Sequence, residues 1–502
     1  MIVTQAQVSA TNNRDDLYSS VALLEYVLNI EKIYVEALED YILKAESEIK
    51  SLKKATRIFR NQTSTKLKYN SILFQSLRNF QQNAESNLTL IYQALKDLIK
   101  ISYIVEFLRK VKNTNSIYEH FVPIQSDFDG AISGLLRLQR IYGFTAEQLV
   151  KGNLSDIIQL SSKLTAYDCF KIGQKLSDLN IHEYAVGWYK AALNHINETQ
   201  ENTFNSYNKL DSQTIAESLK YSKLLTNDTG DTDKLVGFED LGLVQLACRG
   251  YLEKEPYESR ELHCKYENQN HPFLKLAPLK VEILNLSPYL VIYHNVIYDS
   301  EIEVLKELSQ DNLERAGTWN NDEGKDTSTT YRTSKHSWID NGTHPVVDIL
   351  NQRMYDMTGL SLETSETLQI ANYGIGGHYD IHVDYSEHSD DPRYNSADAF
   401  GSEWGFGDRI ATILFYLSDV PLGGSTVWPY IKVKVNPVRG NAAFWYNLHY
   451  SLEGNVYTLH SSCPVVIGSK WAANKWIWSQ AQIFKRPCQL EFDTSVEEDI
   501  EI

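Results

Sequence analysis

Two histidines and one aspartate in the last third of the chain have the residue types and spacing of a metal site. His382 and Asp384 are separated by a single residue, and His460 follows far downstream. Alternate side chains of a β-strand share a face, so a strand here points His382 and Asp384 the same way. Two imidazoles and one carboxylate form the triad that holds one face of a six-coordinate Fe(II) and leaves the other face open. We therefore predict an iron site at these residues.

A lysine lies close to this triad in the sequence. Lys470 follows His460 by ten positions, at the end of the apolar run 465–467. A cation at the end of a buried strand is suited to bind a carboxylate through a charge-assisted hydrogen bond. We predict that Lys470 binds the distal carboxylate of 2-oxoglutarate while the other end chelates the metal. Three further histidines compete for the metal role, namely His378, His388 and His449.

The segments around the triad read as short strands separated by turns. A glycine-rich stretch at 372–377 precedes His382, and an apolar run covers 409–417. A turn at 423–429 and another apolar segment at 440–448 follow. Short strands with turn signals at this spacing indicate a jelly-roll barrel.

The segment from about 285 to 490 resembles the catalytic domain of the collagen prolyl 4-hydroxylase alpha subunit. The matching phrases, in order, are Gln-Ile-Ala-Asn-Tyr-Gly at 369–374, Asp-Arg-Ile-Ala-Thr at 408–412, Phe-Trp-Tyr-Asn-Leu at 444–448, Cys-Pro-Val at 463–465 and Gly-Ser-Lys-Trp-Ala-Ala-Asn-Lys-Trp at 468–476. A weaker resemblance extends through the N-terminal half. It implies a procollagen-proline 4-dioxygenase that uses Fe(II), 2-oxoglutarate, O2 and L-ascorbate and releases succinate and CO2. Lysine at 470 fits this type of enzyme, since lysyl hydroxylases and oxygen-sensing prolyl hydroxylases use arginine.

The resemblance also implies roles for residues outside the triad. Tyr373 would assist Lys470 in binding 2-oxoglutarate, Arg409 would donate to peptide carbonyls, and Trp476 would pack on the proline ring. An internal ion pair for Arg409 and core packing for Trp476 are the alternatives. The segment 331–335 resembles a loop that closes over the peptide, and an exposed charged loop without function is the alternative there.

Trp478 departs from the family pattern, which has a histidine eight residues after the lysine. That histidine assists the handling of 2-oxoglutarate, whereas tryptophan has no acceptor and does not titrate. We expect an active enzyme that couples its two half-reactions less well or prefers another substrate. The rival readings are a hydroxylase of a non-collagen peptide and a non-catalytic peptide-binding subunit. The intact triad and Lys470 argue against the second.

Composition excludes several classes of protein. The chain has 502 residues, 42% of them hydrophobic, and its net charge of −17 arises from 65 acidic and 48 basic residues. Nucleic-acid binding requires clustered Lys and Arg, and a membrane span requires about 18 consecutive apolar residues, so neither is expected. The resemblance implies the endoplasmic reticulum lumen, although no signal peptide is visible at 1–10. Glycosylation motifs agree with a secretory glycoprotein and lie at Asn61, Asn87, Asn153, Asn197, Asn227, Asn285 and Asn341.

The five cysteines predict two disulfides by resemblance. The pairs implied are Cys248 with Cys264 and Cys463 with Cys488, each closing a short loop worth about 3 kcal/mol in the chain-entropy model. Cys169 is left over, and its apolar neighbours favour a buried thiol. No C-x-x-C motif occurs, so a zinc or thioredoxin-like site is not supported.

The N-terminal half is predicted to be helical. Apolar residues recur at spacings of three and four from 17 to 52, which is typical of a coiled coil. By resemblance this segment joins two copies of the chain, and packing on a helix at 76–111 is the alternative. Residues 127–196 resemble one tetratricopeptide-like unit, which in the family binds proline-rich peptide as a polyproline helix. The candidate contacts, each with core packing as the alternative, are Tyr167, Tyr184, Trp188 and Tyr189. No second repeat can be read in the polar stretch 194–233.

We therefore predict an α+β multidomain chain. Its regions are a helical coiled-coil dimerisation region at 1–120, a helical peptide-substrate-binding domain at 121–235, a disulfide-stapled linker at 236–285, a dioxygenase domain at 286–490 folded as a double-stranded β-helix (jelly roll), and an acidic tail at 491–502. The resemblance implies protein disulfide isomerase as a beta subunit.

Overall fold

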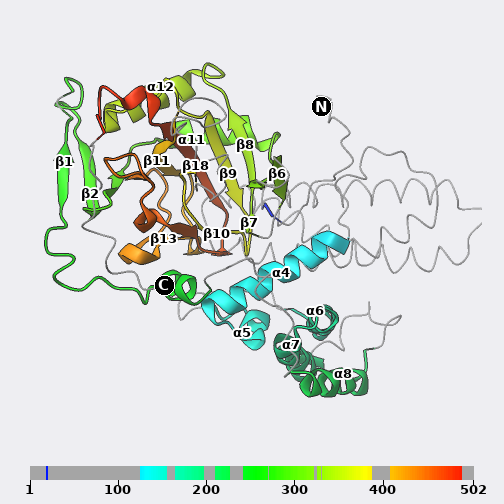
Figure 1. The fold of residues 1–502 in the computed structure, drawn as a ribbon. Helices are drawn as coiled ribbons and strands as arrows, with labels where there is room; N and C mark the ends of the chain where they lie inside the picture. Colours follow the sequence, from blue (N-terminus) through cyan, green and yellow to red (C-terminus); the bar gives the residue numbers. More distant parts are fainter. Residues whose placement is uncertain are drawn as a thin grey trace, which may run out of the picture.

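The computed structural model describes residues 19–20, 125–154, 164–196, 210–226, 241–269, 271–320, 325–328, 331–386 and 407–488. The predicted coiled coil, apart from Ser19 and Ser20, and the acidic tail lie outside these residues. Within them, helices dominate up to Arg249, and sheets flanked by helices follow from Cys264 onward (Figure 1). None of the helices described is both long and apolar enough to cross a membrane.

The helical region consists of short amphipathic helices. They are α4 (Gln125–Tyr142), α5 (Ala146–Lys151), α6 (Ala166–Asp178), α7 (His182–His195), α8 (Ser212–Leu224) and α10 (Leu241–Arg249). Thr145 and Thr165 begin α5 and α6 with capping boxes, which satisfy N–H groups that the first turn leaves without partners. The short connection between α6 and α7 makes a helical hairpin on which α8 packs. The sequence of α8 carries no broad apolar stripe, and α8 therefore buries little beyond Ile215.

The region after residue 264 is built on two main sheets among the described residues (Figure 1). The nine-stranded sheet has the order β1 (Cys264–Glu267), β2 (Leu279–Asn285), β3 (Leu290–His294), β15 (Ala442–Tyr446), β11 (Arg409–Tyr416), β18 (Lys470–Trp478), β9 (Leu368–Tyr373), β8 (Lys335–Ile339), β4 (Glu314–Arg315). The five-stranded sheet has the order β14 (Val433–Val435), β13 (Thr426–Trp428), β16 (His460–Ser462), β10 (His378–His382), β7 (Arg332–Thr333). Two small pairs are β12 (Leu422–Gly423) with β17 (Val465–Ile467) and β5 (Gly317–Asn320) with β6 (Lys325–Ser328).

Apolar side chains fill both faces of the larger sheet. One face packs on the smaller sheet through a cluster that includes Trp428, Trp445 and Tyr416. The other face packs on α11 (Asp299–Gln310) and α12 (Pro345–Thr358). Strands buried on both faces read as continuous apolar runs, which explains why β11 is apolar throughout most of its length. Two facing sheets built largely of antiparallel strands agree with the predicted jelly roll.

The structure corrects the predicted disulfides. Cys248 is bonded to Cys463, 215 positions away, with the two Cα atoms 5.7 Å apart. Cys264 and Cys488 are exposed free thiols, so the pairings Cys248–Cys264 and Cys463–Cys488 are wrong. The reason is tertiary, because α10 packs on β13 and β14 and carries Cys248 to the smaller sheet. Cys169 is a buried free thiol, as predicted.

One predicted domain boundary and one predicted loop also change. The segment 236–285 is more than a linker, because its strands β1 and β2 extend the larger sheet, which therefore begins before residue 286. The segment 331–335 is not an exposed loop beyond Tyr331, which is exposed. Arg332 and Thr333 form β7, which pairs with β10, and Lys335 begins β8 and is fully buried.

Candidate metal centre

The structure brings the three predicted ligands together. His382 ends β10, His460 begins β16, and the two residues lie opposite each other in the antiparallel pair. Each Nε2 atom lies 3.7 Å from an oxygen of the Asp384 carboxylate. One ligand atom from each of the three residues lies within 4.8 Å of the others. A single metal ion about 2 Å from nitrogen and oxygen ligands fits this spacing.

Backbone carbonyls orient both imidazoles for coordination. Nδ1 of His382 lies 2.7 Å from the carbonyl oxygen of Asp380, and Nδ1 of His460 lies 3.0 Å from that of Thr458. A carbonyl only accepts, so each Nδ1 carries the proton and each Nε2 offers a lone pair. Burial, and after it the neighbouring His460, lower the pKa of His382 to about 3. The ring is therefore neutral at physiological pH, as a metal ligand must be.

Asp384 is held as a carboxylate by a chain of hydrogen bonds. The Thr412 hydroxyl donates to Asp384 Oδ2 at 2.8 Å, and Asn447 Nδ2 donates to Thr412 Oγ1 at 2.9 Å. Burial alone would raise the pKa of Asp384, but the two imidazoles, Arg409 and the Thr412 hydroxyl hold it below its usual value. His382, Asp384 and His460 together supply two imidazole nitrogens and one carboxylate, which is the donor set of a non-haem Fe(II) centre.

Aromatic rings enclose the two imidazoles. Tyr379 stacks on His382 with ring centroids 3.6 Å apart. Trp445 meets His460 edge-on at 5.0 Å, and Trp428 lies 5.9 Å from it. These rings restrict imidazole rotation and keep bulk water from the inner side of the ligands.

The ammonium group of Lys470 points between the two sheets. Its Nζ donates to Ser462 Oγ at 2.7 Å and to Thr426 Oγ1 at 3.5 Å, and it lies 5.3 Å from the ring centroid of Tyr373. Burial lowers the pKa of Lys470 to about 7, since the side chains that receive its hydrogen bonds are hydroxyls. Ser462 follows His460 by two residues on β16, so the cation and the metal ligands border the same space.

Arg409 makes an internal ion pair beside the metal ligands. Its Nε lies 2.5 Å from Glu366 Oε1 and its Nη2 lies 3.0 Å from Oε2, while Nη1 donates to the Asp384 carbonyl at 3.4 Å. The guanidinium lies 4.5 Å from the ring centroid of Trp476 and 6.0 Å from that of Trp478. This arrangement matches the ion-pair alternative for Arg409 and places Trp478 against a cation.

The competing histidines do not join the cluster. His378 is fully buried at the start of β10, and His449 follows β15, but the described metal-ligand group contains neither. His388 lies outside the described residues.

Only part of the predicted peptide-binding set is accessible. Trp188 and Tyr189 are buried in the helical core, where Trp188 Nε1 donates to Gln139 Oε1 at 2.9 Å. The predicted peptide contacts are therefore wrong for these two rings, because their side of α7 faces its neighbouring helices. Tyr167 and Tyr184 are partly exposed.

Sequence reasoning missed the polar residues that support the site. Of these, Ser462 had a readable signal, because it lies two positions after His460 and alternate residues of a strand share a face. Thr412, Asn447 and Thr426 reach the site from other segments, and their local sequences predict only buried positions in or beside strands.

Comparisons with known proteins agree over nearly the whole chain. Residues 20–156 match the family described as "Prolyl 4-Hydroxylase alpha-subunit, N-terminal region", and residues 368–478 match the "2OG-Fe(II) oxygenase superfamily". The chain is 31% identical over 523 residues to prolyl 4-hydroxylase subunit alpha-2 of Caenorhabditis elegans, with 95% of this chain and 94% of that protein covered. It is 32% identical over 523 residues to prolyl 4-hydroxylase subunit alpha-1 of Homo sapiens, with 94% of this chain and 95% of that protein covered. A solved structure, the viral collagen prolyl hydroxylase of Paramecium Bursaria Chlorella virus-1, is 24% identical to this chain with a TM-score of 0.31. The alignment covers 38% of this chain and 95% of the viral chain.

Proposed function

This chain belongs to the family of prolyl 4-hydroxylase alpha subunits, and on that premise we propose that it hydroxylates C4 of peptidyl proline in collagen-like chains. It is a dioxygenase that depends on 2-oxoglutarate and Fe(II). The reaction consumes O2 and 2-oxoglutarate and yields 4-hydroxyproline, succinate and CO2.

The position of Lys470 relative to the three metal ligands carries this proposal. Its ammonium is bound to Ser462, two residues from His460, so one end of 2-oxoglutarate can pair with Lys470 while the other chelates the metal. A metal-storage or sugar-binding barrel has no use for a buried cation at this place.

The chain's own residues prepare the site for the reaction. His382, Asp384 and His460 would hold the ion by one face, and Lys470 with Tyr373 beside it would orient the co-substrate. Bound Fe(II) supplies the redox chemistry that activates O2. The protein contributes orientation and the exclusion of water.

Trp476 is the proposed contact for the substrate proline. It is stacked from one side by the Arg409 guanidinium and lies 6.0 Å from the exposed Trp338. Trp476 itself is only 6% exposed, so a polyproline segment would reach it past the exposed ring of Trp338. Arg409 forms an ion pair with Glu366 and acts by positioning the ring of Trp476. Tyr167 and Tyr184 are the proposed peptide contacts in the helical domain 121–235.

Further features of the family's alpha subunits are proposed on resemblance. They are self-association through the region 1–120, pairing with protein disulfide isomerase as a beta subunit, use of L-ascorbate to restore oxidised iron, and residence in the endoplasmic reticulum lumen.

The proposal is tested by incubating the chain, with its beta subunit, with (Pro-Pro-Gly) peptides, Fe(II), 2-oxoglutarate and ascorbate. Mass spectrometry should show a gain of one oxygen per modified proline, matched by succinate. The His382→Ala variant should lose peptide-dependent succinate formation. Unchanged activity of that variant would remove the metal assignment.

A second candidate is a hydroxylase of a non-collagen peptide. The burial of Trp188 and Tyr189 favours it, because two of the four predicted groove rings are out of reach. Including proline-containing peptides without the Pro-Pro-Gly repeat in the same experiment distinguishes the two candidates.

A further inference from the structure

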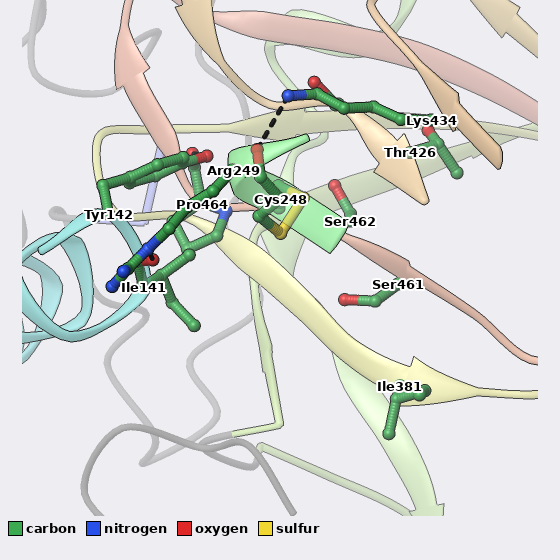
Figure 2. Close-up of a disulfide and its surroundings, with 12 residues drawn as sticks. Ile141, Tyr142, Cys248, Arg249, Ile381, Thr426, Lys434, Ser461, Ser462 and Pro464 are labelled. Carbon is green, nitrogen blue, oxygen red and sulfur yellow. Dashed lines mark hydrogen bonds between the residues drawn. A yellow bond between two sulfur atoms is a disulfide. The ribbon is translucent and has the colours of Figure 1, made fainter. Parts of the chain in front are cut away.

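The helical region lies directly against the two strands that carry the histidine ligands. Figure 2 shows Tyr142 of α4 and Cys248 of α10 meeting the sheet beside Pro464, with Ile381 and Ser461 nearby. Since β16 has three residues and β10 has five, few ladder hydrogen bonds hold them. Their pairing is also irregular between Tyr379 and His382. Packing against their outer faces therefore matters for their position.

On the β10 side, α4 contacts the turn that leads into the strand. The guanidinium of Arg137 donates from Nη1 to the carbonyl of Gly376. The helix and the turn meet backbone to backbone, because a Cβ placed on Gly376 would lie 2.6 Å from the Cα of Gly134. The contact thus fixes the turn through a charge-assisted hydrogen bond and through close approach of two glycines.

On the β16 side, both helices contact the segment that follows the strand. The hydroxyl of Tyr142 donates to the Pro464 carbonyl at 2.7 Å, and the neighbouring Cys463 is bonded to Cys248 of α10. Lys434 Nζ donates to the Cys248 carbonyl at 2.7 Å, the bond dashed in Figure 2. Arg249 in turn donates to the Ile141 carbonyl at 2.6 Å and ties α10 to α4.

Between these polar contacts the two regions share one apolar core. Buried residues of α4 and of the sheet region, among them Leu138, Val427 and Val466, belong to the same cluster. Ile381 packs against this cluster. Neighbouring side chains of a strand point to opposite faces, so the residue before His382 faces the helices while His382 faces the metal site.

We propose that α4 and the Cys248–Cys463 bridge hold β10 and β16 at the separation the metal requires, with Arg137 and Tyr142 as positioning residues. This inference rests on the metal assignment made under the proposed function. The helical region is then part of the frame of the metal site as well as a binder of peptide.

The test measures Fe(II) and 2-oxoglutarate binding without turnover. Anaerobic titration of the full chain with its beta subunit follows the charge-transfer absorption of the ternary complex in wild type, Arg137→Met and Tyr142→Phe. Arg137→Met should weaken metal binding about 10-fold, the lower end of the effect of groups that orient metal ligands, and Tyr142→Phe should weaken it less. The KM for 2-oxoglutarate should rise in parallel while the KM for peptide stays unchanged.

Lys175→Met is the matched control. Lys175 of α6 pairs with Asp129 of α4 at 2.7 Å, so its loss disturbs α4 without touching the sheet, and the metal affinity should not change. Wild-type metal affinity in both Arg137→Met and Tyr142→Phe would overturn the inference. If Arg137→Met does not fold, Tyr142→Phe and the double variant Cys248→Ser/Cys463→Ser decide instead. Absence of the absorption band in wild type would refute the proposed function itself.

Discussion

Replacing Lys470 by methionine tests the assignment of the co-substrate pocket most directly. Methionine is unbranched and one atom shorter than lysine, so it keeps most of the length of the side chain and removes the charge. Lys470 is 2% exposed, and Ser462 and Thr426 accept its hydrogen bonds. A bound dicarboxylate would therefore lose its charged partner, although the hydroxyls of Ser462 and Thr426 would stay.

The size of the effect follows from the burial of the amine. Removing one partner of a buried ion pair costs about 3–5 kcal/mol. Since burial lowers the pKa of Lys470 to about 7, protonating the empty site at pH 8 costs about 1.4 kcal/mol. The net loss is about 1.6–3.6 kcal/mol, or about 15- to 400-fold in the KM for 2-oxoglutarate.

The assay is succinate formation at saturating peptide, with 2-oxoglutarate varied. The KM for peptide should change little, because Lys470 lies between the sheets. Lys475→Met is the control, since Lys475 lies five positions later on β18 and so faces the opposite side of the sheet. Its buried Nζ finds no hydrogen-bond partner among the residues that the structure describes, so its loss should be neutral or stabilising. A KM for 2-oxoglutarate within twofold of wild type in Lys470→Met would refute the assignment.

Three further outcomes are expected. A bound carboxylate raises the pKa of Lys470 from about 7, so above that pH the binding of 2-oxoglutarate takes up a proton. The KM for 2-oxoglutarate should therefore rise up to about tenfold per pH unit in wild type but not in Lys470→Met. Thr412→Val removes the hydrogen bond to Asp384 and should weaken Fe(II) binding about 10- to 100-fold by anaerobic titration, with a wild-type affinity as the contrary result. Trp478→His should lower the ratio of succinate to hydroxyproline, and identical ratios in the two proteins would show that Trp478 does not affect coupling.

The sequence by itself predicted the three candidate metal ligands and the kind of fold. His382 and Asp384 were predicted to share one strand face, because side-chain direction in a strand repeats every two residues. In the structure β10 ends at His382 and Asp384 lies in the bend that follows, from which its carboxylate still reaches both imidazoles. The apolar runs at 409–417 and 440–448 predicted buried strands, which β11 and β15 confirm. These features depend on neighbours in the chain, so a local pattern carries them.

Only the tertiary structure decided which distant residues meet. The partner of Cys248 is 215 positions away, and the partner of Arg409 is Glu366 on another segment. Thr412 and Asn447 reach Asp384 through hydrogen bonds, and Arg137 reaches the turn before β10, across strand and helix contacts for which no short-range spacing exists. Burial also determined that Trp188 and Tyr189 serve the core, because an aromatic side chain on a helix has the same local sequence whether its face meets solvent or another helix.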